Sequence, residues 1–126
     1  MHQFNILLED RPGELARVTA ALSHTNIRSI STEKHKSGKT TVKLITADSN
    51  STKSALVKHT FEFTETDIIL VGLLDRPGEL HKLAKRLGDE GVNIQDIYTM
   101  ERGAFALSVD NTQLTKAREL LAENLI

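Results

Sequence analysis

Apolar residues in this chain follow two different periods, one typical of strands and one typical of helices. Near the N-terminus, three apolar residues at alternate positions predict a strand with one buried face: Phe4, Ile6 and Leu8. Three further apolar residues follow at helical spacing and predict a helix that buries one side: Leu15, Val18 and Leu22. The chain therefore begins with a predicted strand and helix.

The next segments predict a hairpin, a second helix and a further strand. A strand is expected over 27–35, and the turn residues of 36–39 lead into a return strand with Val42, Leu44 and Thr46 on one face. A short polar helix is expected over 51–59. Phe61 and Phe63 then alternate with polar residues, which predicts one more strand.

A repeat divides the sequence into two halves. The hexapeptide from Asp10 to Leu15 recurs without change from Asp75 to Leu80, 65 positions later, and these two copies hold the only two prolines of the chain. The similarity continues beyond the hexapeptides, because Leu22 aligns with Leu87 and the pair Asn26-Ile27 aligns with Asn93-Ile94. We therefore predict two homologous units, residues 1–65 and 66–126.

The second half repeats the same elements except the last. Strands are expected around 69–73, 93–100 and 105–109, with helices after the second hexapeptide and over 112–123. No last strand is evident before Leu125-Ile126, so we expect an unpaired sheet edge that is filled by strand exchange or by a second chain. The predicted fold class is α+β: two ferredoxin-like βαββαβ units with mainly antiparallel sheets and helices on one face.

With both hexapeptides on turns between a strand and a helix, the sequence resembles a tandem ACT-domain protein. The motifs that carry the resemblance are the two Asp-Arg-Pro-Gly turns, the apolar helices after them and the Asn-Ile pairs that start the next strands. The resemblance covers nearly the whole chain. It implies a regulatory module that binds a small effector, often an amino acid, between the first turn of one unit and the second strand of its neighbour.

The resemblance also implies a set of ligand-binding residues in each half. Asp10 and Asp75 take the turn position that often contacts the effector, next to Arg11 and Arg76, whereas Gly13 and Gly78 let the backbone approach it. The amides before the second strands complete the set: Asn26 with Ile27, and Asn93 with Ile94. One departure is that Leu8 and Leu73 stand where serine-binding members carry histidine, which argues against a simple copy of a serine site.

Each of these residues also has a simpler structural interpretation. The aspartates can cap the helices, and the glycines can permit close helix packing. Asn26 can adopt a positive φ or bridge a turn, and the two arginines can be solvated. His81 can point toward a ligand or lie exposed on its helix. The sequence leaves these alternatives open.

Composition removes several classes of function. The chain has no cysteine, and its five histidines show no metal-binding spacing, so we expect no metal and no cofactor. No nucleophilic elbow or phosphate-binding glycine motif is present, which argues against an enzyme. A net charge of −1 and few aromatic residues argue against nucleic acid. No signal peptide or membrane span is apparent, so a cytoplasmic protein is expected.

Two hypotheses about function remain. The first is a non-catalytic regulatory protein that binds an amino acid or a similar metabolite and responds at the interfaces between ACT units, as a homodimer. The second is a detached regulatory subunit that docks on an amino-acid biosynthetic enzyme.

Overall fold

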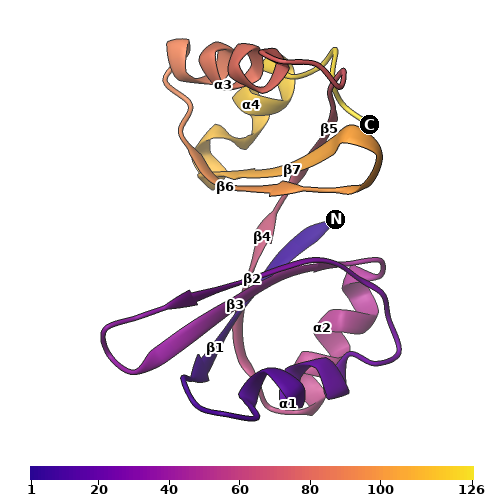
Figure 1. The fold of residues 1–126 in the computed structure, drawn as a ribbon, viewed down its shortest axis with the longest axis vertical. Helices are drawn as coiled ribbons and strands as arrows, with labels where there is room; N and C mark the ends of the chain where they lie inside the picture. The colour runs from indigo at the N-terminus through magenta and orange to yellow at the C-terminus, as the bar shows by residue number, and fades with distance from the viewer. The chain divides into compact units, whose positions relative to one another are not determined.

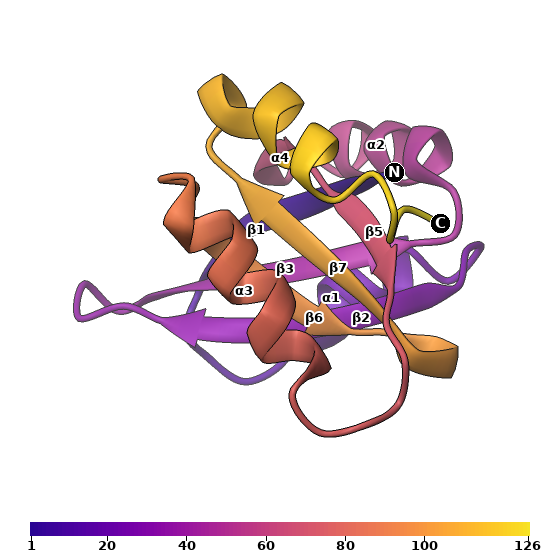
Figure 2. The ribbon, with the colours of Figure 1, turned by 90° about the horizontal axis from the view of Figure 1, so that it is seen from above.

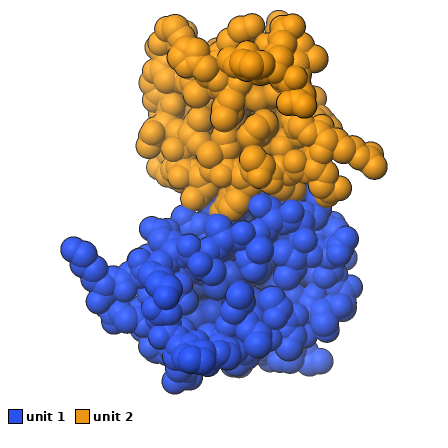
Figure 3. Space-filling view, in the orientation of Figure 1, with its two compact units in different colours: residues 1–66 blue, residues 67–126 orange.

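The computed structural model describes all residues from 1 to 126, and they form two compact units, residues 1–66 and 67–126 (Figure 3). The first unit contains β1 (His2–Glu9), α1 (Glu14–Ala21), β2 (Ile27–Lys34), β3 (Lys39–Thr46), α2 (Ser49–Lys58) and β4 (Glu62–Asp67), whose last residue belongs to the second unit. The second unit contains β5 (Ile69–Gly72), α3 (Glu79–Asp89), β6 (Ile94–Thr99), η1 (Glu101–Gly103), β7 (Ala104–Val109), η2 (Asn111–Gln113) and α4 (Leu114–Leu120). None of the helices is both long and apolar enough to span a membrane.

The first unit is a four-stranded sheet with both helices on one face (Figure 1). The strand order is β2-β3-β1-β4, and β3 pairs antiparallel with β1 and with β2. The alternating residues of β1 and β3 form the core together with one residue each of α2 and α1 and the residue that follows α1: Phe4, Ile6, Leu8, Val42, Leu44, Leu56, Val18 and Leu22. The predicted strands and their buried faces are confirmed in this unit.

The second unit has the same arrangement around a smaller sheet. The order is β5-β7-β6 with antiparallel pairs, and α3 and α4 lie on one face of it (Figure 2). The core again combines alternate strand residues with one side of each helix: Ile69, Val71, Leu107, Val109, Leu83, Leu87, Ala117 and Leu121. The α+β class with antiparallel sheets is thus confirmed.

The edge of β5 is not unpaired, so that part of the sequence prediction is wrong. The Gly72 N–H donates to the Asn124 carbonyl at 2.8 Å, and the Ile126 N–H donates to the Leu70 carbonyl at 3.1 Å. Between them, Val71 and Leu125 form an antiparallel bridge. The segment of residues 124–126 is too short to show an alternating pattern in the sequence, yet two hydrogen bonds are enough to seat it beside β5.

The helices after the hexapeptides start after the proline and the glycine of each turn. Each begins at the glutamate, and Pro12 and Pro77 lie in the turn that precedes it rather than in the first helical turn. Leu15 and Leu80 are 46% and 41% exposed, so the prediction that they join the core is wrong. As the second residue of each helix, these leucines lie in its exposed first turn.

Candidate functional site

Both units contain a cavity at the turn between their first strand and first helix. The cavity of the first unit has a volume of 120 Å³ and is lined by Leu8, Glu9, Asp10, Arg11, Glu14, Leu15, Thr32, Lys34, Thr40 and Val42. The cavity of the second unit has a volume of 170 Å³ and is lined by Leu73, Leu74, Asp75, Arg76, Glu79, Leu80, Gly103 and Phe105. Each residue that lines the second cavity has an equivalent in the lining of the first. Those in the turn and helix are equivalent by the sequence repeat, and Gly103 and Phe105 are equivalent to Thr40 and Val42 by their pairing with the first strand. We call these the turn cavities.

A glutamate that starts the helix lies at the base of each turn cavity. Glu14 is only 6% exposed, and its carboxylate accepts a hydrogen bond from Nε of Arg17 at 2.8 Å, with Nη2 of Arg11 3.3 Å away. The hydrogen bond from Arg17 and the charges of both arginines hold the pKa of Glu14 below its usual value, against the opposing effect of burial. A carboxylate with two cationic partners is fixed in place before any ligand arrives.

The second unit repeats this ionic arrangement. Nε of Arg76 donates to Glu79 at 2.6 Å, and Nζ of Lys82, at the position equivalent to Arg17, donates to the same oxygen at 3.3 Å. The hydrogen bond from Arg76 is the largest cause that lowers the pKa of Glu79. The repeat therefore reproduces an ion cluster as well as a fold.

The predicted arginines are the exposed members of these clusters. The side chains of Arg11 and Arg76 are 68% and 60% exposed, and each is paired with the glutamate three residues further along the chain. Both arginines are therefore held in ion pairs, and binding a ligand carboxylate would weaken these pairs.

Neither predicted aspartate caps a helix, so that interpretation is wrong. Gly13 and Gly78 occupy the N-cap positions, and no side chain caps either helix. The Asp10 N–H donates to the Gly38 carbonyl at 3.0 Å, which holds the turn against the β2–β3 hairpin. The side chain of Asp10 instead lines its cavity, 3.6 Å from Nζ of Lys34.

The two glycines are required by backbone conformation. Gly13 has a φ of 90° and Gly78 a φ of 89°, in the left-handed region that favours glycine. A Cβ atom at either position would meet no atom within 4 Å, so the close-packing interpretation is wrong. The turn conformation leaves space beside the backbone.

The predicted asparagines lie apart from the turn cavities of their own units. Asn26 precedes β2 and its carbonyl accepts the Ala47 N–H at 2.9 Å, whereas the turn cavity lies at the far end of the same strand, near Lys34. Ile27 pairs with Thr46, at that same distant end. Asn26 has no positive φ, so that alternative is also wrong.

The same separation holds in the second unit. The Asn93 N–H donates to Oε1 of Gln113 at 3.4 Å, and Ile94 pairs with Val109. Neither residue lines the cavity beside Asp75. Within one unit the two sets therefore lie at opposite ends of the sheet, and the predicted site needs the turn of one unit and the asparagine of another.

The structure adds residues that the sequence reasoning did not select as site residues. Glu14 and Glu79 are two such residues, and the signal that points to them is their identity within the repeated hexapeptide. Lys34 joins the first cavity only through the hairpin, which no local pattern reveals. His81 lies exposed on α3 and lines neither cavity.

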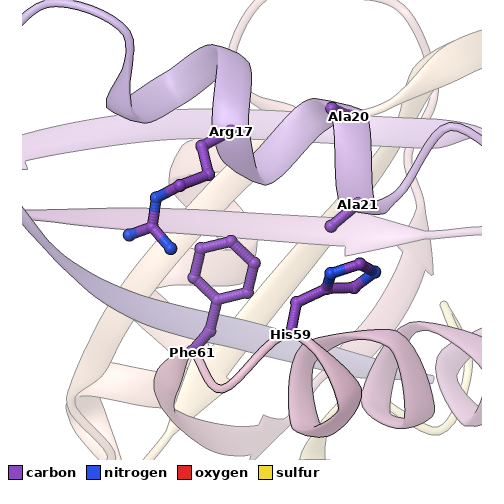
Figure 4. A pocket seen from close by; sticks show the side chains of 5 residues that line it. All are labelled: Arg17, Ala20, Ala21, His59 and Phe61. Atoms are coloured by element: carbon purple, nitrogen blue, oxygen red, sulfur yellow. The ribbon is translucent and has the colours of Figure 1, made fainter.

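A separate groove of 350 Å³ lies between α1 and the segment after α2, lined by Arg17, Ala20, Ala21, His59 and Phe61 (Figure 4). The guanidinium of Arg17 stacks on the Phe61 ring, with its carbon 4.4 Å from the ring centre. In the second unit, the residue equivalent to Ala21 is Arg86, which donates to the Leu120 carbonyl at 3.2 Å and to Oδ1 of Asn124 at 3.0 Å. The groove is thus a point where the two units differ.

Comparisons with known proteins give structural neighbours but no sequence match. No protein-family model and no curated protein matches the chain. A protein from Bacteroides thetaiotaomicron has a similar structure, with a TM-score of 0.86 and 24% identity over 99% of this chain and 90% of that one. The chain has an ACT-like fold.

Two further neighbours with this ACT-like fold are described as regulatory subunits of aspartate kinase. The subunit from Thermus thermophilus, in its ligand-free form, has a TM-score of 0.67 and 19% identity over 98% of this chain and 91% of its own length. The subunit from Thermus flavus has a TM-score of 0.62 and 21% identity over 97% and 90%. At these identities the similarity extends to the fold alone.

Proposed function

We propose that this chain is a tandem ACT-domain regulatory protein, with repeats over residues 1–65 and 66–126, that binds amino acids in its two turn cavities. The observation that carries the proposal is the duplication of the same cavity. Both copies place an aspartate at the rim and a fixed glutamate at the base. Neither aspartate caps its helix, which leaves both carboxylates available to a ligand.

The chemistry of an amino acid matches the groups around each cavity. Its ammonium needs an anionic acceptor, which Asp10 or Asp75 supplies without giving up a helix cap. Its carboxylate needs donors, and the backbone N–H groups of the first helical turn supply these at the positive end of the helix. We include Arg11, Gly13, Arg76 and Gly78 in the site as the residues that shape the turn.

The asparagines enter the proposal only through another ACT unit. Asn26, Ile27, Asn93 and Ile94 lie far from the cavity of their own unit and would reach a ligand only from a neighbouring one. A ligand held in this way binds one arrangement of units more tightly than another and shifts the population between them. Regulation then needs no catalytic residue in this chain. A homodimer remains a prediction, which light scattering tests.

Thermal-shift measurements with each of the twenty amino acids at millimolar concentration test the proposal. A ligand that binds only the folded chain stabilises it by about 2.7 kcal/mol at a hundred times its Kd, so at least one amino acid should raise the melting temperature. Asp10→Ala should abolish the rise caused by a ligand of the first cavity, and Asp75→Ala the rise caused by a ligand of the second. If none of the twenty produces a shift, amino-acid binding is excluded as the function.

A second candidate function is a detached regulatory subunit that docks on a biosynthetic enzyme. The names of two structural neighbours, both regulatory subunits of aspartate kinase, favour it. Under this alternative, adding the protein would change the effector response of a partner enzyme. If the protein changes the effector response of none of the amino-acid biosynthetic enzymes of its host, only the first function remains.

A further inference from the structure

The two turn cavities share their base but differ in what surrounds it. In the first cavity Val42 lies opposite Ile6, and in the second cavity Phe105 lies opposite Val71 at the equivalent place. Glu9, which pairs with Lys39, is replaced by Leu74. The second cavity therefore has a larger apolar side chain at one position and lacks a carboxylate at another.

The hairpin strand explains the largest difference. β2 continues past Thr32 to Lys34, and both side chains line the first cavity. β6 ends at Thr99, which pairs with Phe105 as Thr32 pairs with Val42, and no residue of β6 lines the second cavity. The first cavity therefore gains an ammonium and a hydroxyl that the second lacks.

Charge separates the two cavities in the same way. Nζ of Lys34 lies 3.6 Å from Oδ1 of Asp10 and the lysine side chain is 74% exposed, so one cation and one anion face the entrance together. No basic side chain pairs with Asp75, because the nearby Arg76 is held by Glu79 at 2.6 Å. An exposed leucine borders both cavities (Leu15 at 46% and Leu80 at 41%), but only the second adds Leu74, which is 62% exposed.

We infer that the two cavities bind different amino acids, and this inference rests on the proposed function. The first takes a small polar amino acid, with its ammonium at Asp10 and its carboxylate shared by Lys34 and the N–H groups of the first helical turn, because a zwitterion complements these charges. The second, larger by 50 Å³ (170 Å³ against 120 Å³), takes an amino acid with an apolar side chain that covers Leu74, Leu80 and Phe105. One chain can thus bind two different amino acids at the same time.

Isothermal titration calorimetry of the full chain tests this inference. The probes are threonine and asparagine for the first cavity, and valine and leucine for the second. We expect one site per chain for each class, and saturation with one class should not reduce the number of sites for the other. A single amino acid that fills two sites of equal affinity would overturn the inference but leave amino-acid binding intact.

Two variants assign the sites. Lys34→Ala should weaken the polar amino acid about tenfold, the effect of losing one charge-assisted hydrogen bond, and leave the apolar one unchanged. Leu74→Ser should weaken the apolar amino acid about threefold and leave the polar one unchanged. Lys36→Ala, on the same hairpin but outside the cavity, and Val57→Ser, an exposed apolar position on α2, are matched controls.

The remaining outcomes are equally decisive. The inference is wrong if Lys34→Ala and Leu74→Ser each weaken the polar and the apolar amino acid to the same extent. It is also wrong if Lys34→Ala has no larger effect than Lys36→Ala on the polar amino acid and Leu74→Ser no larger effect than Val57→Ser on the apolar one. If no probe binds the unmodified chain, and the twenty-amino-acid screen also finds nothing, the proposed function fails together with the inference.

Discussion

Nε of Arg17 donates a hydrogen bond to the Glu14 carboxylate at 2.8 Å, one helical turn away in α1. This pair holds a nearly buried carboxylate at the base of the first turn cavity, and Glu79 with Arg76 and Lys82 reproduces it in the second. Because both pKa values are lowered in the folded chain, each glutamate stabilises the fold above its usual pKa and loses that contribution as the pH falls through the lowered value.

Acid melting tests these clusters. The melting temperature should fall as the pH is lowered from 5 to 3, and Glu14→Gln or Glu79→Gln should lower the melting temperature at pH 7 and flatten its dependence on pH. Glu119→Gln, at an exposed position in α4, is the control and should retain the steep dependence. Equal slopes for all three variants would show that the ion clusters do not stabilise the fold.

The turn glycines should be sensitive to any side chain. Gly13→Ala and Gly78→Ala should each cost about 1–2 kcal/mol, the strain of an L-residue in the left-handed region, although a Cβ would meet no atom. Gly88→Ala, inside α3, is the matched control and should instead stabilise the chain by about 0.5–1 kcal/mol. Chemical denaturation measures all three, and a neutral Gly13→Ala would contradict the assigned turn.

Replacing a helix-capping aspartate should lower the stability of the chain, whereas replacing a turn aspartate should weaken ligand binding. Asp48 accepts a hydrogen bond from the Ser51 N–H at 3.2 Å and caps α2, so Asp48→Ala should lower the melting temperature by a few degrees. Asp10→Ala and Asp75→Ala should leave the melting temperature of the free protein nearly unchanged, and each should remove the shift caused by the ligand of its own cavity. Comparable losses in free protein for all three would mean that the turn aspartates serve the fold.

Arg86 should stabilise the second unit more than a surface cation does. Its guanidinium donates to the end of α4 and to Asn124, so Arg86→Ala should cost about 2 kcal/mol in urea denaturation. Lys85→Ala, which removes an exposed pair with Asp89, should cost no more than about 0.5 kcal/mol. Similar losses for the two variants would show that the contacts to α4 contribute nothing.

The elements of the fold could be predicted from the sequence because their signals are local. Alternation placed the buried face of β1, and the spacing of Val18 and Leu22 placed the buried side of α1. Gly91 follows the end of α3 with a φ of 77°, as is typical of a glycine that ends a helix. Such residues report on their immediate neighbours along the chain, so a single sequence is enough.

The parts that could not be predicted depend on contacts distant in the sequence. Leu15 has the spacing of a core residue, but its place at the open first turn of α1 exposes it. The pairing of residues 124–126 with β5 joins segments some fifty positions apart. Lys34 lines its cavity because β2 extends further along the sheet than the equivalent strand β6. The turn aspartates were identified as candidates, but only the geometry showed that glycine occupies the cap.

Crystals grown with a stabilising amino acid test the central claim most directly. The account predicts electron density for the ligand in a turn cavity, with its ammonium within hydrogen-bonding distance of the carboxylate of Asp10 or Asp75. Density for the same ligand elsewhere on the chain, with both turn cavities empty, would contradict it.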